Sequence, residues 1–269
     1  MIIFLFFIVW AIVFSLLTFL SGLSYLFAFL WFFVGFLSGY VFVALVIILT
    51  IPYVFYGKKT SRLKHYYLRS LCDFVRLFVL RLYITKIKGL ENIPKDSAFG
   101  AYGNHRSGAD ALIGLSAIRV PLSFMAKDSI FINKLVSKWL KGFGIIELDR
   151  ENPRKALKEI NKGSKLMEEG LSMLVFPEGT RKKEEFHNLD TFKPGAFKLT
   201  TKAKLPILPI AIIGAEQYHK RYLRKPTNVQ VIIDKPITYD EYKDLNSQEL
   251  SDKVAGKIMK MLKENETLK

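Results

Sequence analysis

The chain has 269 residues, of which 50% are hydrophobic, and its 40 Lys and Arg against 24 Asp and Glu give a formal net charge of +16. This composition excludes an intrinsically disordered chain, which is poor in hydrophobic residues, and the single cysteine excludes a disulfide-stapled module. The first charged residue is Lys58, so an uncharged part precedes a strongly charged one. The contrast predicts a hydrophobic membrane anchor at residues 1–57 and one catalytic or binding domain at residues 58–269.

The uncharged part contains two long apolar stretches. A membrane-spanning helix needs about 20 apolar residues, and both Ile2–Leu20 and Tyr25–Ile51 supply that length. Ser21–Ser24 is the turn expected between them, and Pro52 is expected to close the second helix. A cleaved signal peptide is the alternative interpretation. Signal peptides have basic residues before a shorter apolar core, whereas no Lys or Arg precedes the apolar run of this chain.

A cluster of basic residues directly follows the apolar part. Its members are Lys58, Lys59, Arg62, Lys64, Arg69, Arg76 and Arg81. Basic residues beside membrane helices favour the cytoplasmic side and attract anionic lipid, so the cluster predicts a protein of the cell membrane with its catalytic domain on the cytoplasmic face. The two helices can cross the bilayer or lie in one leaflet. Both arrangements place the charged domain on the cytoplasmic face, and both stay open.

Short apolar runs alternate with amphipathic stretches through the charged part. The runs predict strands at Tyr83–Lys88, Ala98–Tyr102, Leu122–Met125, Ile145–Leu148, Met173–Phe176, Ile207–Ile213 and Val229–Ile233. The stretches between them predict helices at Leu63–Leu82, Ala109–Ile118, Ile130–Leu140, Pro153–Glu169, Gly195–Ala203 and Tyr239–Glu264. This alternation is typical of an α/β fold with a mixed, mostly parallel sheet flanked by helices.

The segment Asn104–Asp110 (NHRSGAD) follows a predicted strand and opens a helix. Histidine is the side chain best suited to proton transfer near neutral pH, and a carboxylate can fix its tautomer and support the imidazolium. His105 on the loop and Asp110 on the first helical turn can meet in this way. A His and an Asp at this spacing also occur by chance, but the carboxyl end of a strand is where sites in α/β proteins gather.

The segment Phe176–Arg181 (FPEGTR) also follows an apolar strand. Gly179 permits a tight turn, and the guanidinium of Arg181 can bind a phosphate through two hydrogen bonds. Glu178 can orient that arginine or bind a substrate hydroxyl. A turn with a surface arginine is the alternative interpretation of this segment taken alone.

Two further strand ends carry cations. The strand in Gly144–Arg150 (GIIELDR) delivers Arg150, and Lys127 follows another strand, where a solvated lysine is the alternative interpretation. Leu205–Ile212 (LPILPIAI) predicts scaffold or a pocket wall. A His–Asp pair together with cations, on a domain tied to a membrane, suits a substrate with a hydroxyl, a phosphate and an acyl chain.

The segments NHRSGAD, GIIELDR, FPEGTR and LPILPIAI resemble, in this order, the four blocks of the glycerophospholipid acyltransferases, most closely the 1-acyl-sn-glycerol-3-phosphate (lysophosphatidic acid) acyltransferases. The resemblance runs from about Gly89 to Ile213, and Phe192–Leu199 (FKPGAFKL) also fits. The family usually has Ser after EGTR, whereas this chain has Lys182.

The resemblance implies a membrane-bound enzyme of phospholipid biosynthesis that transfers a fatty acyl group from a thioester to the sn-2 hydroxyl of 1-acyl-sn-glycerol 3-phosphate, giving phosphatidic acid. It implies His105 as general base and Asp110 as its partner. Substrate would be bound by Glu178, Gly179, Thr180, Arg181, Arg150 and Lys127. The expected partners are membrane lipid, lysophosphatidic acid, and acyl-CoA or acyl-carrier protein as co-substrate, with no nucleic acid, no cofactor and no metal.

Three alternatives stay open on the sequence alone. The first is an acyltransferase for another acceptor, such as glycerol 3-phosphate or a different lysophospholipid. The second is a membrane-anchored basic module that binds nucleic acid or acidic lipid, which explains the charge but not His105 and Asp110. The third is a metal hydrolase, for which the four His residues lack a paired spacing and a Cys cluster.

Overall fold

The computed structural model of the chain describes residues 1–22, 25–149, 152–179, 192–219 and 225–266. Contacts within the chain divide it into two compact units, Met1–Gly57 and Lys58–Lys269. The division falls where the charged residues begin.

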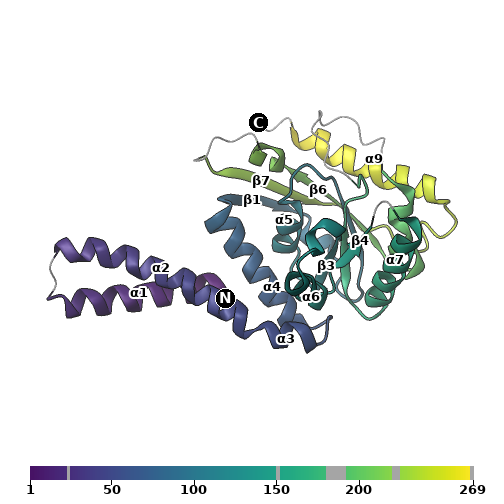
Figure 1. Cartoon of the computed structure of the whole chain (residues 1–269). Helices are drawn as coiled ribbons and strands as arrows, with labels where there is room; N and C mark the ends of the chain where they lie inside the picture. The colour runs from purple at the N-terminus through teal and green to yellow at the C-terminus, as the bar shows by residue number, and fades with distance from the viewer. Residues whose placement is uncertain (23–24, 150–151, 180–191, 220–224, 267–269) are drawn as a thin grey trace. The chain divides into compact units, whose positions relative to one another are not determined.

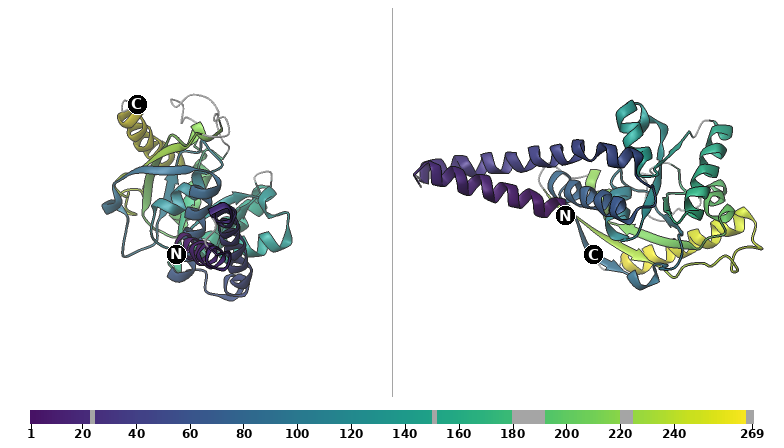
Figure 2. Two further views of the ribbon diagram at one scale, coloured as in Figure 1. Left: turned by 90° about the vertical axis from the view of Figure 1, so that its left-hand side faces the viewer. Right: turned by 90° about the horizontal axis from the view of Figure 1, so that it is seen from below.

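The first unit contains two long helices, α1 (Ile2–Leu20) and α2 (Tyr25–Leu49), which lie side by side (Figures 1 and 2). The Phe6 ring packs edge to face on Tyr40 at 5.1 Å between centroids, and a Cβ on Gly39 would lie 2.6 Å from that ring. Glycine therefore lets the two helices approach closely. By length and composition, α1 and the stretch that includes α2 can each cross a membrane.

The prediction that Pro52 closes the second helix is wrong in detail. α2 ends at Leu49, and a short helix, α3 (Ile51–Tyr56), follows it. The Thr50 hydroxyl donates to the carbonyl of Val46 at 2.7 Å, at the end of α2. Pro52 stands in the first turn of α3, where the missing N–H removes no helical hydrogen bond, so it begins a helix.

The described part of the second unit contains one seven-stranded sheet in the order β1-β7-β6-β2-β5-β3-β4. The strands are β1 (Leu82–Lys88), β2 (Gly100–Gly103), β3 (Leu122–Lys127), β4 (Ile146–Leu148), β5 (Ser172–Val175), β6 (Ile207–Ile213) and β7 (Thr227–Ile233). Neighbouring strands are parallel except β6 and β7, which are antiparallel. The predicted mixed, mostly parallel sheet is confirmed.

Helices cover both faces of the sheet (Figure 1). They are α4 (Arg62–Phe74), α5 (Asp110–Ala117), α6 (Lys134–Gly142), α7 (Pro153–Glu168), α8 (Lys198–Lys202) and α9 (Ser247–Glu266). On β5, Leu174 contacts Gly114 of α5, while Met173 and Val175 join the buried apolar cluster that includes residues of α7, α8 and α9. Because side chains alternate across a strand, α5 lies on one face and the cluster on the other.

The predicted helix Leu63–Leu82 is shorter than expected. Its α-helical part ends at Phe74 and continues as one π-helical turn, Val75–Val79. Arg81 then adopts a left-handed conformation with φ of +48°, and β1 begins at Leu82. The positive φ ends the helical path, which a periodicity of apolar residues does not reveal.

The predicted helix Tyr239–Glu264 begins eight residues late, at Ser247. The Asn246 side chain accepts from the N–H of Gln248 and of Glu249, at 2.9 and 3.0 Å, and the Glu249 carboxylate accepts from the Asn246 N–H at 2.8 Å. This reciprocal capping box fixes the helix start at Asn246.

Candidate active site

The candidate residues gather at one edge of the sheet. His105 follows β2, Glu178 follows β5, and Lys127 ends β3. These three strands are adjacent and parallel in the order β2-β5-β3, so their carboxyl ends lie side by side at the same edge. The predicted position of the site at the strand ends therefore holds for these three residues.

The His105–Asp110 contact predicted from the spacing is present. Nδ1 of His105 lies 2.8 Å from Oδ2 of Asp110, the first residue of α5. A carboxylate only accepts hydrogen bonds, so Nδ1 carries the proton and donates it, and neutral His105 keeps its lone pair on Nε2. The histidine is thereby held in the tautomer that can accept a proton at Nε2.

Backbone N–H groups hold the Asp110 carboxylate in place. Its Oδ2 also accepts from the N–H of Arg106 at 2.7 Å and of Ser107 at 2.8 Å. The residue is fully buried at the start of a helix, where negative charge is favoured by the helix dipole. Three donors that converge on one oxygen fix the orientation of the carboxylate and so of the imidazole.

Glu178 supports the same loop from the neighbouring strand. Its Oε1 accepts from the backbone N–H of His105 at 2.9 Å, and its side chain is buried. Burial raises the pKa of the Glu178 carboxyl, while the His105 hydrogen bond and the charge of Arg106 oppose the rise. The sequence suggested that Glu178 orients Arg181 or binds a hydroxyl; its contact with the His105 backbone was not predicted.

Asn104 fixes the other end of the loop to the sheet. Its side-chain amide donates to the carbonyl of Ile212 and accepts from the Ile212 N–H, both at 2.8 Å. The amide thus pairs with β6 as a further strand residue would. All of β6 is buried, in agreement with the prediction that Leu205–Ile212 is scaffold or a pocket wall.

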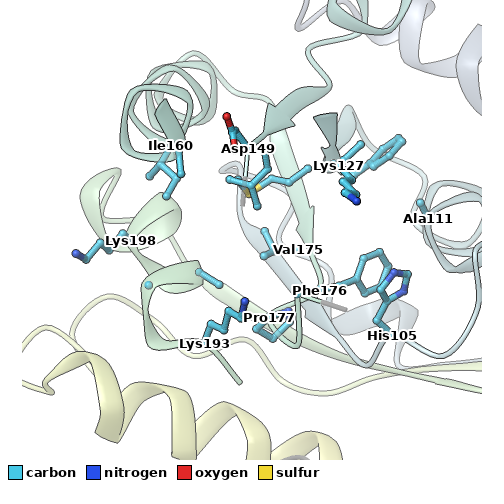
Figure 3. A pocket seen from close by; sticks show the side chains of 18 of the residues that line it. His105, Ala111, Lys127, Asp149, Ile160, Val175, Phe176, Pro177, Lys193 and Lys198 are labelled. Atoms are coloured by element: carbon cyan, nitrogen blue, oxygen red, sulfur yellow. The ribbon is translucent and has the colours of Figure 1, made fainter. Parts of the chain in front are cut away.

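The His105 ring opens onto a cavity of about 570 Å³ (Figure 3). The ring stacks on Phe176 with 4.5 Å between centroids and an interplanar angle of 16°. His105 and Phe176 lie at one end of the view, and Ile160 and Lys198 at the other. The apolar part of the wall is formed by Phe124, Met125, Leu148, Ala156, Leu157, Ile160 and Val175.

Three lysines border this cavity: Lys127, Lys193 and Lys198 (Figure 3). All three are exposed, and within the described part of the chain none has a carboxylate within 4.0 Å. They are available to an anionic group of a bound molecule. Lys127 was predicted, whereas Lys193 and Lys198 were not, although both belong to the segment FKPGAFKL.

Three predicted substrate-binding residues, Arg150, Thr180 and Arg181, lie outside the described residues. Gly179 lies at the edge of the cavity with φ of +71°, a conformation that favours glycine. Its backbone approaches the Lys193 side chain, since a Cβ there would lie 3.1 Å from a side-chain carbon of that lysine.

The arrangement can remove a proton from a hydroxyl group at His105 Nε2. The cavity beside this base is apolar along its wall and bordered by lysines, so it suits a molecule with both a long apolar part and an anionic part. The contacts of Phe176 and Glu178 with His105 could not be predicted from sequence, because each joins residues that follow two different strands.

Comparisons with known proteins give one consistent similarity. The sequence model of the Acyltransferase family matches residues 84–213. The chain is 30% identical to a 1-acyl-sn-glycerol-3-phosphate acyltransferase of Bacillus subtilis over 61% of this chain and 79% of that protein. It is also 30% identical to a probable 1-acyl-sn-glycerol-3-phosphate acyltransferase of Mycoplasma pneumoniae, over 68% of this chain and 74% of the relative.

A chloroplast relative is longer. The chain is 30% identical to a 1-acyl-sn-glycerol-3-phosphate acyltransferase of Brassica napus over 76% of its own length, but it spans only 59% of that protein. Among solved structures, the 1-acyl-sn-glycerophosphate (LPA) acyltransferase PlsC from Thermotoga maritima has the same fold, with a TM-score of 0.60 and 22% identity, over 83% of this chain and 92% of that one.

Proposed function

Because the chain belongs to the 1-acyl-sn-glycerol-3-phosphate acyltransferase family, we propose that it transfers a fatty acyl group from a thioester to the sn-2 hydroxyl of 1-acyl-sn-glycerol 3-phosphate, which gives phosphatidic acid. The observation that carries the proposal is His105, half-buried and held by the buried Asp110 carboxylate, facing an apolar cavity bordered by lysines. That combination matches a substrate with a hydroxyl, a phosphate and an acyl chain.

His105 is the general base of the proposed reaction. Its Nε2 takes the proton of the acceptor hydroxyl, whose oxygen attacks the thioester carbonyl. The new C–O bond forms, the C–S bond breaks, and the proton passes from His105 to the departing sulfur. The products are an ester and a thiol, and no acyl-enzyme is required. Cys72 is buried with its pKa raised to about 12, so it is unsuited to act as a nucleophile.

Asp110 positions His105 and stabilises the imidazolium that forms when the proton arrives. The support is the 2.8 Å contact and the two backbone N–H groups that hold the same carboxylate oxygen. Glu178 positions the loop through the His105 N–H.

Substrate binding is divided between charge and apolar surface. Lys127, Lys193 and Lys198 attract the phosphate or an acidic donor, and the wall formed by residues such as Met125 and Ile160 contacts an acyl chain. That Arg150 and Arg181 bind the phosphate, beside Gly179 and Thr180, stays a prediction from the resemblance. The thioester donor is acyl-CoA or acyl-carrier protein, and no cofactor takes part.

The proposed location is the cell membrane, with the charged domain on the cytoplasmic face. The support is two apolar helices of sufficient length, followed by the basic cluster that begins at Lys58. A lipid acceptor can then reach the domain without its chain crossing water.

A donor and acceptor screen with the purified, detergent-solubilised chain tests the proposal. Labelled acyl-CoA and acyl-carrier protein are combined with lysophosphatidic acid, glycerol 3-phosphate and other lysophospholipids. We expect transfer to lysophosphatidic acid with loss of activity in His105→Ala, by about 10²–10⁴-fold in kcat. Preferred transfer to another acceptor would overturn the substrate, and full activity of His105→Ala would overturn the mechanism.

A further inference from the structure

A patch of large apolar side chains is exposed beside the cavity, over the start of α6. The exposed fractions are 51% for Ile130, 83% for Ile132, 56% for Leu135 and 43% for Val136. These four residues are named the 130–136 patch. Single exposed apolar residues are ordinary on a protein surface, but neighbouring ones of this size mark an interaction site.

The local structure explains why the patch is open to solvent. Asn133 caps α6 by accepting from the N–H of Leu135 at 2.9 Å and of Val136 at 3.1 Å, so the helix begins after Ile132. Leu135, Val136 and Trp139 share one side of α6 at a spacing of i, i+1 and i+4, and Ile132 directly precedes the N-cap. This stripe enters the core only at its far end.

That far end is anchored by aromatic packing. Trp139 is half-buried and packs edge to face on the buried Phe143 at 4.7 Å between centroids. The helix is therefore fixed to the domain at its C-terminal end while its N-terminal end presents aliphatic side chains outward.

The charges within α6 are of one sign, although Asp128 precedes the patch and Lys141 pairs with Glu147 at 2.6 Å. From Ser129 to Ile146 the chain has three lysines, Lys134, Lys138 and Lys141, and no carboxylate. Their spacing puts them on the side of α6 opposite the apolar stripe. An apolar side with Leu, Val and Trp and a polar side of lysines is the pattern of helices that lie in the interface of an anionic membrane.

The patch is continuous with the cavity. Ile130 and Leu157 line the cavity and are also exposed, at 51% and 44%, and Lys127 borders the same opening. A surface that covered the 130–136 patch would therefore also meet the cavity mouth.

We propose that the 130–136 patch docks the second unit on the surface of an anionic lipid bilayer, apart from the contact made by the apolar helices of the first unit. The chain also carries two helices long and apolar enough to enter a bilayer, which favours a lipid surface as the partner. The aliphatic tips of Ile132 and Leu135 enter the acyl region, and the lysines contact headgroups. The consequence for acyl-chain entry rests on the proposed function, but the docking itself does not.

Fluorescence of the full chain in vesicles tests the docking. Cys72 is the only cysteine and is buried, so Ile132→Cys can be labelled at one site with an environment-sensitive dye. Lys260→Cys is the control, because this side chain is 76% exposed on α9. With vesicles of phosphatidylcholine and phosphatidylglycerol whose chains carry bromine, we expect a blue shift and quenching at position 132 and neither at position 260.

Equal responses at the two positions would overturn the proposal. A response at position 132 that follows the concentration of this chain or of acyl-carrier protein, and not that of vesicles, would also overturn it and indicate a protein partner.

Activity gives a second readout. In the double variant Ile132→Ser/Leu135→Ser, we expect transfer to a long-chain acceptor embedded in vesicles to fall about 10-fold, with transfer to a soluble short-chain acceptor unchanged. An equal fall for both acceptors would contradict an interfacial role. If the wild-type chain transfers no acyl group, the proposed function fails, whereas the fluorescence experiment still decides the docking.

Discussion

The two ends of the cavity are built differently. At the histidine end, Asp110 and Glu178 are buried and hydrogen-bonded to their neighbours at 2.7–2.9 Å. At the lysine end, Lys193 and Lys198 are exposed, and in the described residues no carboxylate lies within 4.0 Å of either. The first end is held by hydrogen bonds before a substrate arrives, whereas the lysines of the second end are exposed and accessible to an anionic group of a bound molecule.

The difference between the two ends of the cavity separates a contribution to catalysis from a contribution to substrate binding. A preorganised base acts on the reacting atoms and should affect kcat, while exposed cations act on binding and should affect KM. Four substitutions test this separation, in order of decreasing expected effect.

Asp110→Asn should lower kcat by about 10²-fold or more, because the amide no longer fixes the proton on Nδ1 of His105. The KM for the acceptor should change little. Steady-state kinetics measure both, with circular dichroism as the check of folding. Asp252→Asn, which changes an exposed carboxylate on α9, is the matched control. An unchanged kcat would show that the histidine end does not depend on its carboxylate.

Lys193→Ala/Lys198→Ala should raise the KM for the phosphorylated acceptor or the acidic donor by about 10-fold, the equivalent of about 1.4 kcal/mol. The kcat should stay close to that of the wild type. Lys202→Ala is the control on the same helix as Lys198, because Lys202 bonds to Asn161 and does not line the cavity. A fall in kcat without a change in KM would contradict the division between the two ends.

Ile160→Trp should shorten the acyl chain that the cavity accepts. Each buried methylene contributes about 0.8 kcal/mol, so loss of contact with two of them lowers kcat/KM for a long-chain substrate by roughly 10-fold. Short-chain substrates should be affected much less. Competition between substrates of different chain length measures the ratio, and equal losses for all lengths would indicate that the apolar wall does not bind the chain.

Glu178→Gln should have the smallest effect and should change the pH dependence of stability. The pKa of Glu178 is raised in the folded state, so the folded chain binds this proton more tightly than the unfolded chain. Stability from this group is present below its ordinary pKa and is lost as pH rises through the raised value. The variant should therefore gain Tm relative to the wild type as pH rises from 4 to 8, by no more than a few degrees. If the Tm values of the variant and of the wild type changed with pH in parallel, the result would contradict a buried Glu178 carboxyl with a raised pKa.

The sequence predicted the local features of this protein well. Each of the seven predicted strands overlaps an observed one, and α1 has the predicted bounds. The meeting of His105 with Asp110 was also predictable, because five residues across a loop and one helical turn restrict the two side chains. Predicted helix bounds were wrong where the periodicity of apolar residues runs on beyond the point at which a cap or a turn limits the helix. The Asn246 cap, which begins α9, is an example.

Contacts between distant segments were not predictable from sequence. Glu178 lies 73 residues from His105, and their hydrogen bond depends on β2 and β5 being neighbours. Lys193 and Lys198 line the cavity from the start of α8 and the turn before it, and a lysine in the sequence gives no signal of that position. The same holds for the 130–136 patch, since an apolar stripe does not reveal how much of it the core covers.

The sequence by itself determined the apolar first part, the charged second part, the strands and the short-range His105–Asp110 pair, because each depends on residues close in the chain. The tertiary structure decided the strand order, the antiparallel β6–β7 pair, the support of the histidine loop by Asn104 and Glu178, and the division of the cavity into a fixed end and a cationic end. The physical reason is that these features arise from pairing and packing between segments far apart in sequence, which hydrophobic periodicity and motif spacing do not encode.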